Sequence, residues 1–244
     1  MKIRYFSDLH LEFITEIDQF IKNIPHGPDE ICICAGDIGN PYESNYNTFM
    51  KFISLNFKKS FVISGNHEYY NKEKSMNETN DFLTTYFKQY NNISFLDNSY
   101  EIYNNYCFIG STLWSKITNP NYEINDVHKI PNFDYNIYNN LNTKCVDFLE
   151  QTLQNNVNCI VITHHVPSYS LIDAKYKGST YNEWFCCDLD DLIKAHSPKI
   201  KCWIYGHTHT PSSIKINNVP FLCNPIGYPH ENSNVNFQAT VLLE

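Results

Sequence analysis

The chain opens with Ile3-Arg4-Tyr5-Phe6-Ser7-Asp8-Leu9-His10, in which an apolar run ends in an Asp-x-His pair. The apolar part is rich in β-branched and aromatic residues, and it predicts a buried strand at residues 3–6. Two later stretches repeat this pattern, with residues 30–35 leading into Gly36-Asp37 and residues 61–64 leading into Gly65-Asn66-His67-Glu68. A strand followed at once by a polar motif is therefore a recurring feature of this sequence.

Helical stripes alternate with these strands, which indicates an α/β fold. The residues Ile17, Phe20, Ile21 and Ile24 have helical spacing. Similar stripes predict helices at 49–53, 82–87, 141–153 and 189–193, and further apolar runs predict strands at 106–109, 157–163, 201–205 and 237–243. Asn217-Asn218 between residues 213–215 and 220–223 predicts a hairpin. Since the sequence has no repeat and no low-complexity linker, residues 1–244 are predicted to form a single domain.

Two more polar motifs come at strand ends. His164-His165 ends the run at 157–163, and Gly206-His207-Thr208-His209 ends the run at 201–205. Ligands of open α/β sheets bind outside the carboxyl ends of the strands, so five motifs at five such ends are expected to converge. The glycines at 36, 65 and 206 are expected to let the backbone turn sharply at these ends.

The side chains of these motifs suit metal binding. Imidazole and carboxylate groups bind divalent cations such as manganese, iron or zinc. There are too many candidate ligands for one tetrahedral site and about enough for two metals, which together can hold a hydroxide and clamp a phosphoryl oxygen. The sequence therefore predicts a dinuclear metal centre with a shared carboxylate.

The charged residues include few cations that could bind phosphate. Net charge is −8, and Arg4 is the only arginine, predicted within a strand. A surface for extended nucleic acid needs a basic field, and bidentate phosphate clamps usually need arginine. Bound metal is therefore expected to carry most of the charge that recognises phosphate.

The cysteines and the hydropathy pattern bear on location. The nine cysteines form no Cys-x-x-Cys pair, and buried free thiols are expected. No run approaches the roughly 18 apolar residues of a membrane span, and the first six residues are too short for a secretory signal. We expect a cytoplasmic protein that does not enter a membrane; the sequence does not indicate its oligomeric state.

The motif order resembles that of the calcineurin-like metallophosphoesterase superfamily. That order is Asp-x-His, Gly-Asp, Gly-Asn-His-Glu/Asp, His and Gly-His-x-His, and each motif is present here. Three longer segments look like a small subgroup: Ser7-Asp8-Leu9-His10-Leu11-Glu12, Gly110-Ser111-Thr112-Leu113-Trp114 and Asn224-Pro225-Ile226-Gly227-Tyr228. The resemblance implies two β-sheets packed face to face with helices on the outside.

The resemblance also implies roles for individual residues. One metal would take Asp8, His10 and His209, the other would take Asn66, His164 and His207, and Asp37 would bridge them. His67 resembles a non-ligand histidine that faces the substrate with Asn66 and assists the leaving oxygen. Either Glu68 or the neighbourhood of Asp37 could orient it. His165 could support a ligand, touch the substrate or be structural.

The implied function is hydrolysis of a phosphate ester by metal-bound hydroxide. Protein phosphatases of this superfamily continue the second motif into Asp-Arg-Gly, whereas this chain has Gly36-Asp37-Ile38-Gly39-Asn40. A diester carries less charge than a monoester, so a small phosphodiester is the preferred substrate. A phosphomonoesterase or protein phosphatase, a nuclease for short oligonucleotides, and a non-catalytic scaffold are the alternatives.

Some positions are left open by the motifs. The segment 116–138 is rich in Asn, Tyr and Pro, and it predicts a long loop or lid over the site or an irregular surface. Trp114 and Tyr228 could line a pocket or belong to the core. His230 could be functional because it adjoins a subgroup motif, or it could lie on the surface.

Overall fold

The computed structural model describes residues 1–120, 124–231 and 236–243. Their strands are β1 (Lys2–Phe6), β2 (Gly27–Ala35), β3 (Phe57–Ile63), β4 (Ile93–Phe95), β5 (Ser99–Tyr103), β6 (Tyr106–Ser111), β7 (Cys159–Thr163), β8 (Ile200–Tyr205), β9 (Ser212–Ile216), β10 (Val219–Cys223) and β11 (Thr240–Leu242). They form a five-stranded sheet in the order β11-β1-β2-β3-β4 and a six-stranded sheet in the order β5-β6-β7-β8-β10-β9. Strands β1 to β4 are parallel, as are β6, β7, β8 and β10.

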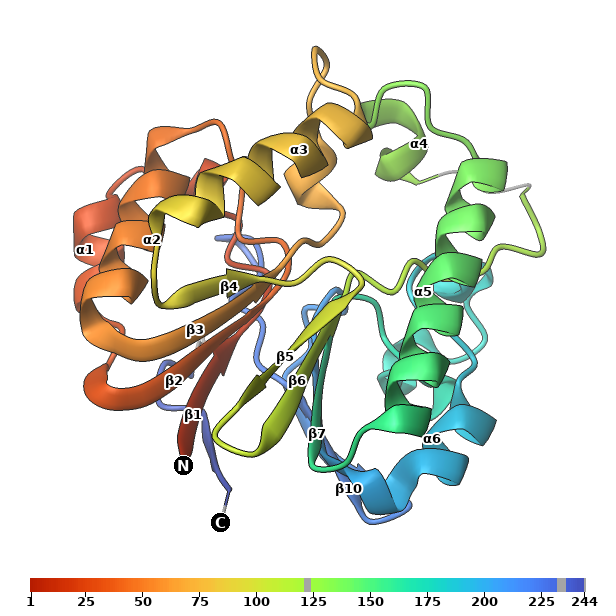
Figure 1. The fold of residues 1–244 in the computed structure, drawn as a ribbon. Helices are drawn as coiled ribbons and strands as arrows, with labels where there is room; N and C mark the ends of the chain where they lie inside the picture. Colours follow the sequence, from red (N-terminus) through yellow and green to blue (C-terminus); the bar gives the residue numbers. More distant parts are fainter. Residues whose placement is uncertain (121–123, 232–235, 244) are drawn as a thin grey trace.

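Helices cover the outer face of each sheet (Figure 1). The α-helices are α1 (Ile17–Lys22), α2 (Ser44–Asn56), α3 (Met76–Tyr86), α4 (Asn125–Lys129), α5 (Tyr135–Asn155) and α6 (Asp190–His196). Helices α1, α2 and α3 lie against the first sheet, and α5 and α6 against the second. The predicted arrangement of two sheets face to face with helices outside is confirmed. No helix of the described residues is long and apolar enough to cross a bilayer.

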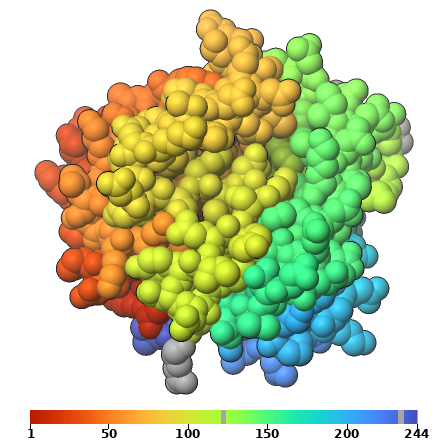
Figure 2. Space-filling model, in the orientation of Figure 1, coloured from red at the N-terminus to blue at the C-terminus, as the bar shows by residue number. Residues whose placement is uncertain are grey.

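Three apolar layers hold the sandwich together. Alternate strand residues such as Ile33 of β2 and Ile162 of β7 belong to one cluster between the sheets. The neighbouring residue Cys34 faces outward and packs with Phe49 of α2 and other helix residues. On the second sheet, Val161 belongs to the cluster that includes α5 and α6. In Figure 2, the residues near 100, in yellow-green, close the space between the two helical layers on this face.

Most predicted elements form, and the differences have physical reasons. Asn217 and Asn218 have φ of 51° and 66° and connect β9 to β10 as a two-residue hairpin turn, as predicted. The strand predicted at 237–243 is shorter, because Phe237 packs against Phe20 of α1 and only Thr240–Leu242 pairs with β1. Strands β4 and β5 were not predicted, since the first has three residues and the second is a half-exposed edge strand.

The segment 116–138 is less irregular than predicted. It contains α4 and the beginning of α5, while residues 121–123 lie outside the described part of the chain. A helix of five residues is too short to show an apolar stripe in the sequence. All nine cysteines are free and buried, as predicted.

The only arginine has a structural role. Arg4 lies in β1, and its side chain is 2% exposed. Its Nη2 lies 2.9 Å from Glu30 Oε2 of β2, and its Nη1 donates to the carbonyl of Phe237. Burial acts to raise the pKa of Glu30, but the hydrogen bonds from Lys2 and Arg4 outweigh it and leave this pKa below its usual value. The ion pair therefore stabilises the fold only while Glu30 is ionised.

We expect Glu30→Gln to lower the free energy of unfolding at pH 7 by about 1–3 kcal/mol, because it leaves the buried guanidinium without its counter-charge. A depressed folded-state pKa gives stability above the unfolded value, near 4.5, that is lost as pH falls through the folded value. The difference between wild type and variant, measured by urea unfolding, should therefore shrink below pH 4.5.

The neighbouring Asp29, whose side chain is 94% exposed, is a matched control. Asp29→Asn should change stability by less than about 0.5 kcal/mol. An equal effect of the two variants, or an effect of Glu30→Gln that does not shrink as the pH falls below 4.5, would contradict the role given to Glu30.

Candidate metal centre

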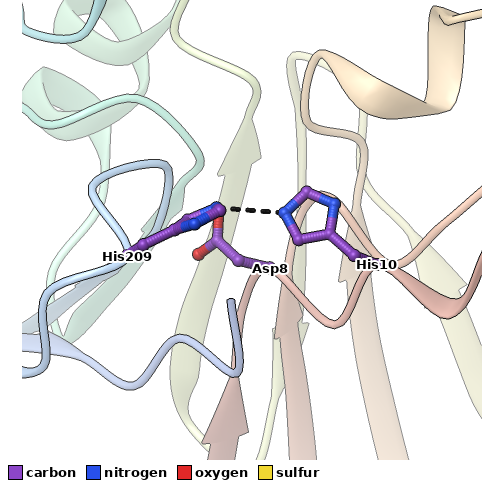
Figure 3. Close-up of side chains that lie close together, drawn as sticks. All are labelled: Asp8, His10 and His209. Atoms are coloured by element: carbon purple, nitrogen blue, oxygen red, sulfur yellow. Dashed lines mark hydrogen bonds and ion pairs between the residues drawn. The ribbon is translucent and has the colours of Figure 1, made fainter. Parts of the chain in front are cut away.

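Three residues from the two ends of the chain form the first group of candidate ligands. Asp8 and His10 follow β1, and His209 follows β8. Their side chains point toward one another (Figure 3), with His10 Nε2 3.0 Å from His209 Nε2 and Asp8 Oδ1 3.4 Å from His209 Nε2. The three could hold one metal ion.

The second group lies beside the first. Asp37, His164 and His207 bring ligand atoms within reach of one cation. His164 Nε2 lies 3.0 Å from Asn66 Oδ1 and 3.2 Å from Asp37 Oδ2. The same Asp37 oxygen is 3.9 Å from Nε2 of His10, a member of the first group. All seven residues predicted as ligands therefore lie together, with Asp37 between the two groups.

The backbone at these ligands is unusual. The left-handed region, rare for residues other than glycine, is adopted by five of the seven, namely Asp8, His10, Asp37, His207 and His209. Among the motif glycines, Gly36 has φ of 83°, as expected for a sharp turn. Gly65 is needed for space instead, because a Cβ there would lie 2.7 Å from His164 Nε2. The same holds for Gly206, where a Cβ would lie 2.7 Å from the Cβ of Ser7.

The Nδ1 atoms of three candidate ligand histidines face hydrogen-bond acceptors on the outer side of the site. The Nδ1 atoms of His10 and His209 face the carboxylates of Glu12 and Glu231, at 3.4 and 2.5 Å. Nδ1 of His164 faces the carbonyl oxygen of Ala35, at 2.9 Å. A proton on each Nδ1 satisfies these contacts and leaves each Nε2 with a bare lone pair directed into the site.

Bare lone pairs in contact repel one another unless a cation lies among them. His10 Nε2 faces His209 Nε2, and His164 Nε2 faces the oxygens of Asn66 and Asp37. Nε2 of His207 is buried and has no hydrogen-bond partner among the described residues. These nitrogen and oxygen donors fit borderline divalent cations. The residues present therefore fit two metal ions.

Without a metal, a second proton on His164 or His209 would supply this positive charge, and the pKa values of these two rings are raised accordingly. Burial acts to lower the pKa of His164, but the Asp37 carboxylate outweighs it and raises the pKa to about 10. Burial also acts to lower the pKa of His209, but the Asp8 carboxylate outweighs it and raises this pKa to about 9. At His207, burial and the neighbouring histidines hold the pKa well below its usual value, so this ring is neutral.

His67 lies beside the ligands and has a partner on each side. Its Nδ1 is 3.0 Å from Glu12 Oε1, and its Nε2 is 3.1 Å from the hydroxyl of Tyr228. The sequence left Glu68 or the neighbourhood of Asp37 as the group that orients this ring. Glu68 accepts hydrogen bonds from backbone N–H groups, and Asp37 accepts one from the His67 amide, so neither contacts the ring nitrogens of His67. Glu12 is therefore the residue that fixes the ring.

Glu68 connects the loops that follow β2 and β3. Its buried carboxylate accepts hydrogen bonds from the backbone N–H groups of four residues, at 2.6–3.3 Å, which are Asp37, Ile38, Gly39 and Gly65. One side chain thus satisfies four donors that the turns leave without sheet partners. Burial, followed by the charge of Asp37, raises the pKa of Glu68 to about 7.

His165 lies behind the site. Its Nδ1 is 3.2 Å from the carbonyl oxygen of Thr112, and its Nε2 is 2.8 Å from the Tyr138 hydroxyl. Burial, followed by the charge of His164, lowers the pKa of His165 to about 3. Both nitrogens are engaged, the ring lies tilted against His207 with centroids 4.2 Å apart, and His165 is not part of the described cavity lining, so this geometry favours support of the candidate ligand His207.

Tyr228 lines the cavity beside the ligands, whereas Trp114 belongs to the apolar core. The loop that carries Tyr228 is fixed by backbone hydrogen bonds, with Ile226 donating to Ser7 and Gly227 donating to Asp8. His230 stacks on Tyr228, with ring centroids 5.9 Å apart, and does not line that cavity.

Asp126 of α4 reaches the site from the segment predicted as a loop. Its Oδ1 accepts hydrogen bonds from Asn66 Nδ2, at 2.7 Å, and from the Tyr70 hydroxyl, at 2.5 Å. The amide of Asn66 is thereby held with its nitrogen toward Asp126 and its oxygen toward His164. Asp126 is fully buried, is not a member of either group of candidate ligands, and orients the candidate ligand Asn66.

The sequence reasoning missed Glu12, Glu231 and Asp126 as members of the site. Glu12 belongs to the segment Ser7-Asp8-Leu9-His10-Leu11-Glu12, and an acid two residues after a candidate ligand is a usable signal for a residue of the site. Glu231 and Asp126 lie in loops or short helices far along the chain from their partners, and no local pattern marks them.

A two-sheet α/β sandwich with paired His/Asp clusters at the carboxyl ends of its strands defines the class of metallophosphoesterases. The chain belongs to the calcineurin-like phosphoesterase family, whose family model matches residues 1–211. An Acanthamoeba polyphaga mimivirus protein, "Uncharacterized protein L509", is 34% identical over 273 aligned positions, which cover 99% of this chain and 96% of that protein.

Solved structures share the fold at low sequence identity. The phosphopantetheinyl hydrolase PptH of Mycobacterium tuberculosis has a TM-score of 0.72 and 15% identity, with 93% of this chain and 90% of that chain covered. The protein TT1561 of Thermus thermophilus has a TM-score of 0.56 and 13% identity, with 92% and 88% covered. At these identities, the likeness shows the fold alone.

We expect Asp126→Ala to weaken metal binding at the group containing Asn66 by about 10–100-fold, because the amide is no longer oriented. Competition with a chelator, followed by metal analysis, measures the affinity. Asp81→Ala on the exposed face of α3 is the control and should bind metal like wild type. Unchanged metal affinity in a folded Asp126→Ala protein would contradict this role.

Proposed function

We propose that the chain is a phosphodiesterase that uses two divalent metal ions, of manganese, iron or zinc, to hydrolyse a small phosphorylated substrate. The observation that carries the proposal is the convergence of histidine Nε2 and carboxylate oxygen atoms, with neighbouring atoms 3.0–3.9 Å apart, directly beside His67. Metals held there would supply positive charge to the phosphoryl oxygens and activate water for attack on phosphorus.

The protein side chains have separate roles in this proposal. Asp37 is central, because its Oδ2 faces both groups while its Oδ1 is held by the amide of His67. The remaining ligands would hold one metal each as two sets of three, Asp8, His10 and His209 for the first and Asn66, His164 and His207 for the second.

His67 would deliver the proton that the leaving oxygen needs. Burial acts to lower its pKa, but the carboxylates of Asp37 and Glu12 outweigh it and raise the pKa above the usual value. The protonated ring donates from Nδ1 to Glu12, which leaves Nε2–H directed toward Tyr228 and the cavity. A leaving oxygen that takes the place of the Tyr228 contact would receive this proton.

The distribution of cations supports a diester. Arg4 is buried in its pair with Glu30, and no lysine or arginine belongs to the described lining of the cavity. A monoester dianion would have only the metals to neutralise it, whereas a diester monoanion needs less positive charge. We further propose that the protein acts in the cytosol, since nine buried free thiols suit a reducing compartment.

The expected activity is turnover of bis(p-nitrophenyl) phosphate by protein loaded with manganese, with a higher kcat/KM than for p-nitrophenyl phosphate. The apoprotein should be inactive. A preference for the monoester would establish the phosphatase alternative. Absence of turnover on both substrates with manganese, iron and zinc would overturn the catalytic proposal and favour a scaffold.

We expect His67→Ala to lower kcat for the diester by about 100-fold or more, because the leaving oxygen loses its proton donor. Metal content should stay at the wild-type level, since His67 is not among the proposed ligands. His196→Ala, on α6 and outside the cavity, is the control and should retain full turnover. Unchanged turnover in His67→Ala would remove the role given to this residue.

A further inference from the structure

A cavity of about 420 Å³ opens directly from the candidate metal centre. One wall consists of residues of that centre, including Asp37, Asn66 and His209. The facing wall comes from residues 166–185, which include the short 3-10 helices η4 (Tyr169–Leu171), η5 (Ala174–Tyr176) and η6 (Thr180–Trp184). The proposed chemistry uses residues of the first wall only and assigns no role to the second.

The second wall is mostly apolar and aromatic, with Ser179 and Asn182 as its polar members. It presents the aliphatic side chains of Val166 and Ile172 and the rings of Tyr176, Tyr181 and Phe185. Tyr176 and Tyr181 are each 45% exposed, so large rings remain accessible at the mouth of the cavity. Phe185 stacks on His207, with centroids 4.5 Å apart and planes at 28°, which carries the aromatic surface up to a proposed metal ligand.

The charged side chains around the cavity limit the substrates that it can accept. Its described lining holds the carboxylates of Asp37 and Glu231 and no lysine or arginine. Asp8 and Glu12 add two more carboxylates beside it. In the proposed function the metals and His67 supply positive charge to the phosphoryl group, and the described lining holds no lysine or arginine to pair with a second anionic group on the substrate. An arm with further phosphates or carboxylates would meet repulsion there.

We propose that this wall binds the organic arm of the substrate, and that the arm is uncharged and carries a flat apolar group. The inference rests on the proposed function, which places the phosphoryl group at the metals and the arm in the cavity beside them. A flat ring can lie against the exposed aromatic side chains and exclude water from them. The cavity is within the size range of small-molecule sites.

Binding of phosphonates tests the arm separately from turnover, because their phosphorus–carbon bond is not hydrolysed as an ester. Manganese-loaded protein is titrated by calorimetry with methylphosphonate, phenylphosphonate and phosphonoacetate. Phenylphosphonate should bind at least about tenfold more tightly than methylphosphonate, as burial of a ring contributes more than a methyl group. Phosphonoacetate, with a charged arm, should bind no more tightly than methylphosphonate.

Variants at Tyr176 locate the effect, since this side chain is at the cavity mouth and its removal leaves the core intact. Tyr176→Ala should reduce the preference for phenylphosphonate by several-fold. Tyr176→Lys should shift the preference toward phosphonoacetate. Tyr100→Ala is the matched control, because Tyr100 is 49% exposed on the edge strand β5 and outside the cavity. It should behave like wild type.

The outcomes separate this inference from the proposed function. Equal affinities for the three phosphonates, or no binding of phenylphosphonate, would overturn the inference, and turnover of bis(p-nitrophenyl) phosphate by the same protein would still uphold the hydrolase. An unchanged preference in both Tyr176 variants would also overturn it. A preference for phenylphosphonate that Tyr176→Ala weakens, in a protein without turnover, would uphold the ligand class and reject the hydrolase.

Discussion

The carboxylate of Glu68 holds the loops after β2 and β3 in one position, and the geometry of the metal centre depends on it. Adjacent parallel strands end at the same edge of the sheet, but nothing in strand pairing fixes the turns beyond them. Glu68 fixes both turns by accepting from N–H groups in each. Because Asp37 in turn accepts from the amide of His67, the proposed central ligand and the proposed proton donor belong to one hydrogen-bonded unit.

This fixed arrangement is necessary because the site is costly to form. Five ligand residues adopt left-handed backbone conformations, each at a cost on the order of 1–2 kcal/mol. Acceptor atoms are also brought into contact, as with Nε2 of His10 and His209. The three apolar layers of the sandwich offset these terms. Bound cations would remove the repulsion, so metal binding would stabilise the folded protein as well as serve catalysis.

The sequence was sufficient for the buried strands that lead into the candidate ligand motifs, because both are local signals. Runs such as residues 3–6 are apolar enough to identify a buried strand, and parallel topology then brings their ends together. The helix α3 had a usable signal as well, the capping box formed by Ser75 and Glu78, which marks its start well before the predicted 82–87. Glu231 and Asp126 could not be assigned, because their roles depend on where loops lie in space.

The short helix α4 shows why such a role escapes local patterns. Ile124, its N-terminal flanking residue, and Asn125 line the cavity, while the next residue, Asp126, holds the amide of Asn66. One short stretch thus touches the space for the substrate and a residue of the metal centre. A substrate arm packed against Ile124 would favour the position of α4 that orients Asn66. By thermodynamic linkage, a metal bound at Asn66 would then favour the same arm to the same extent.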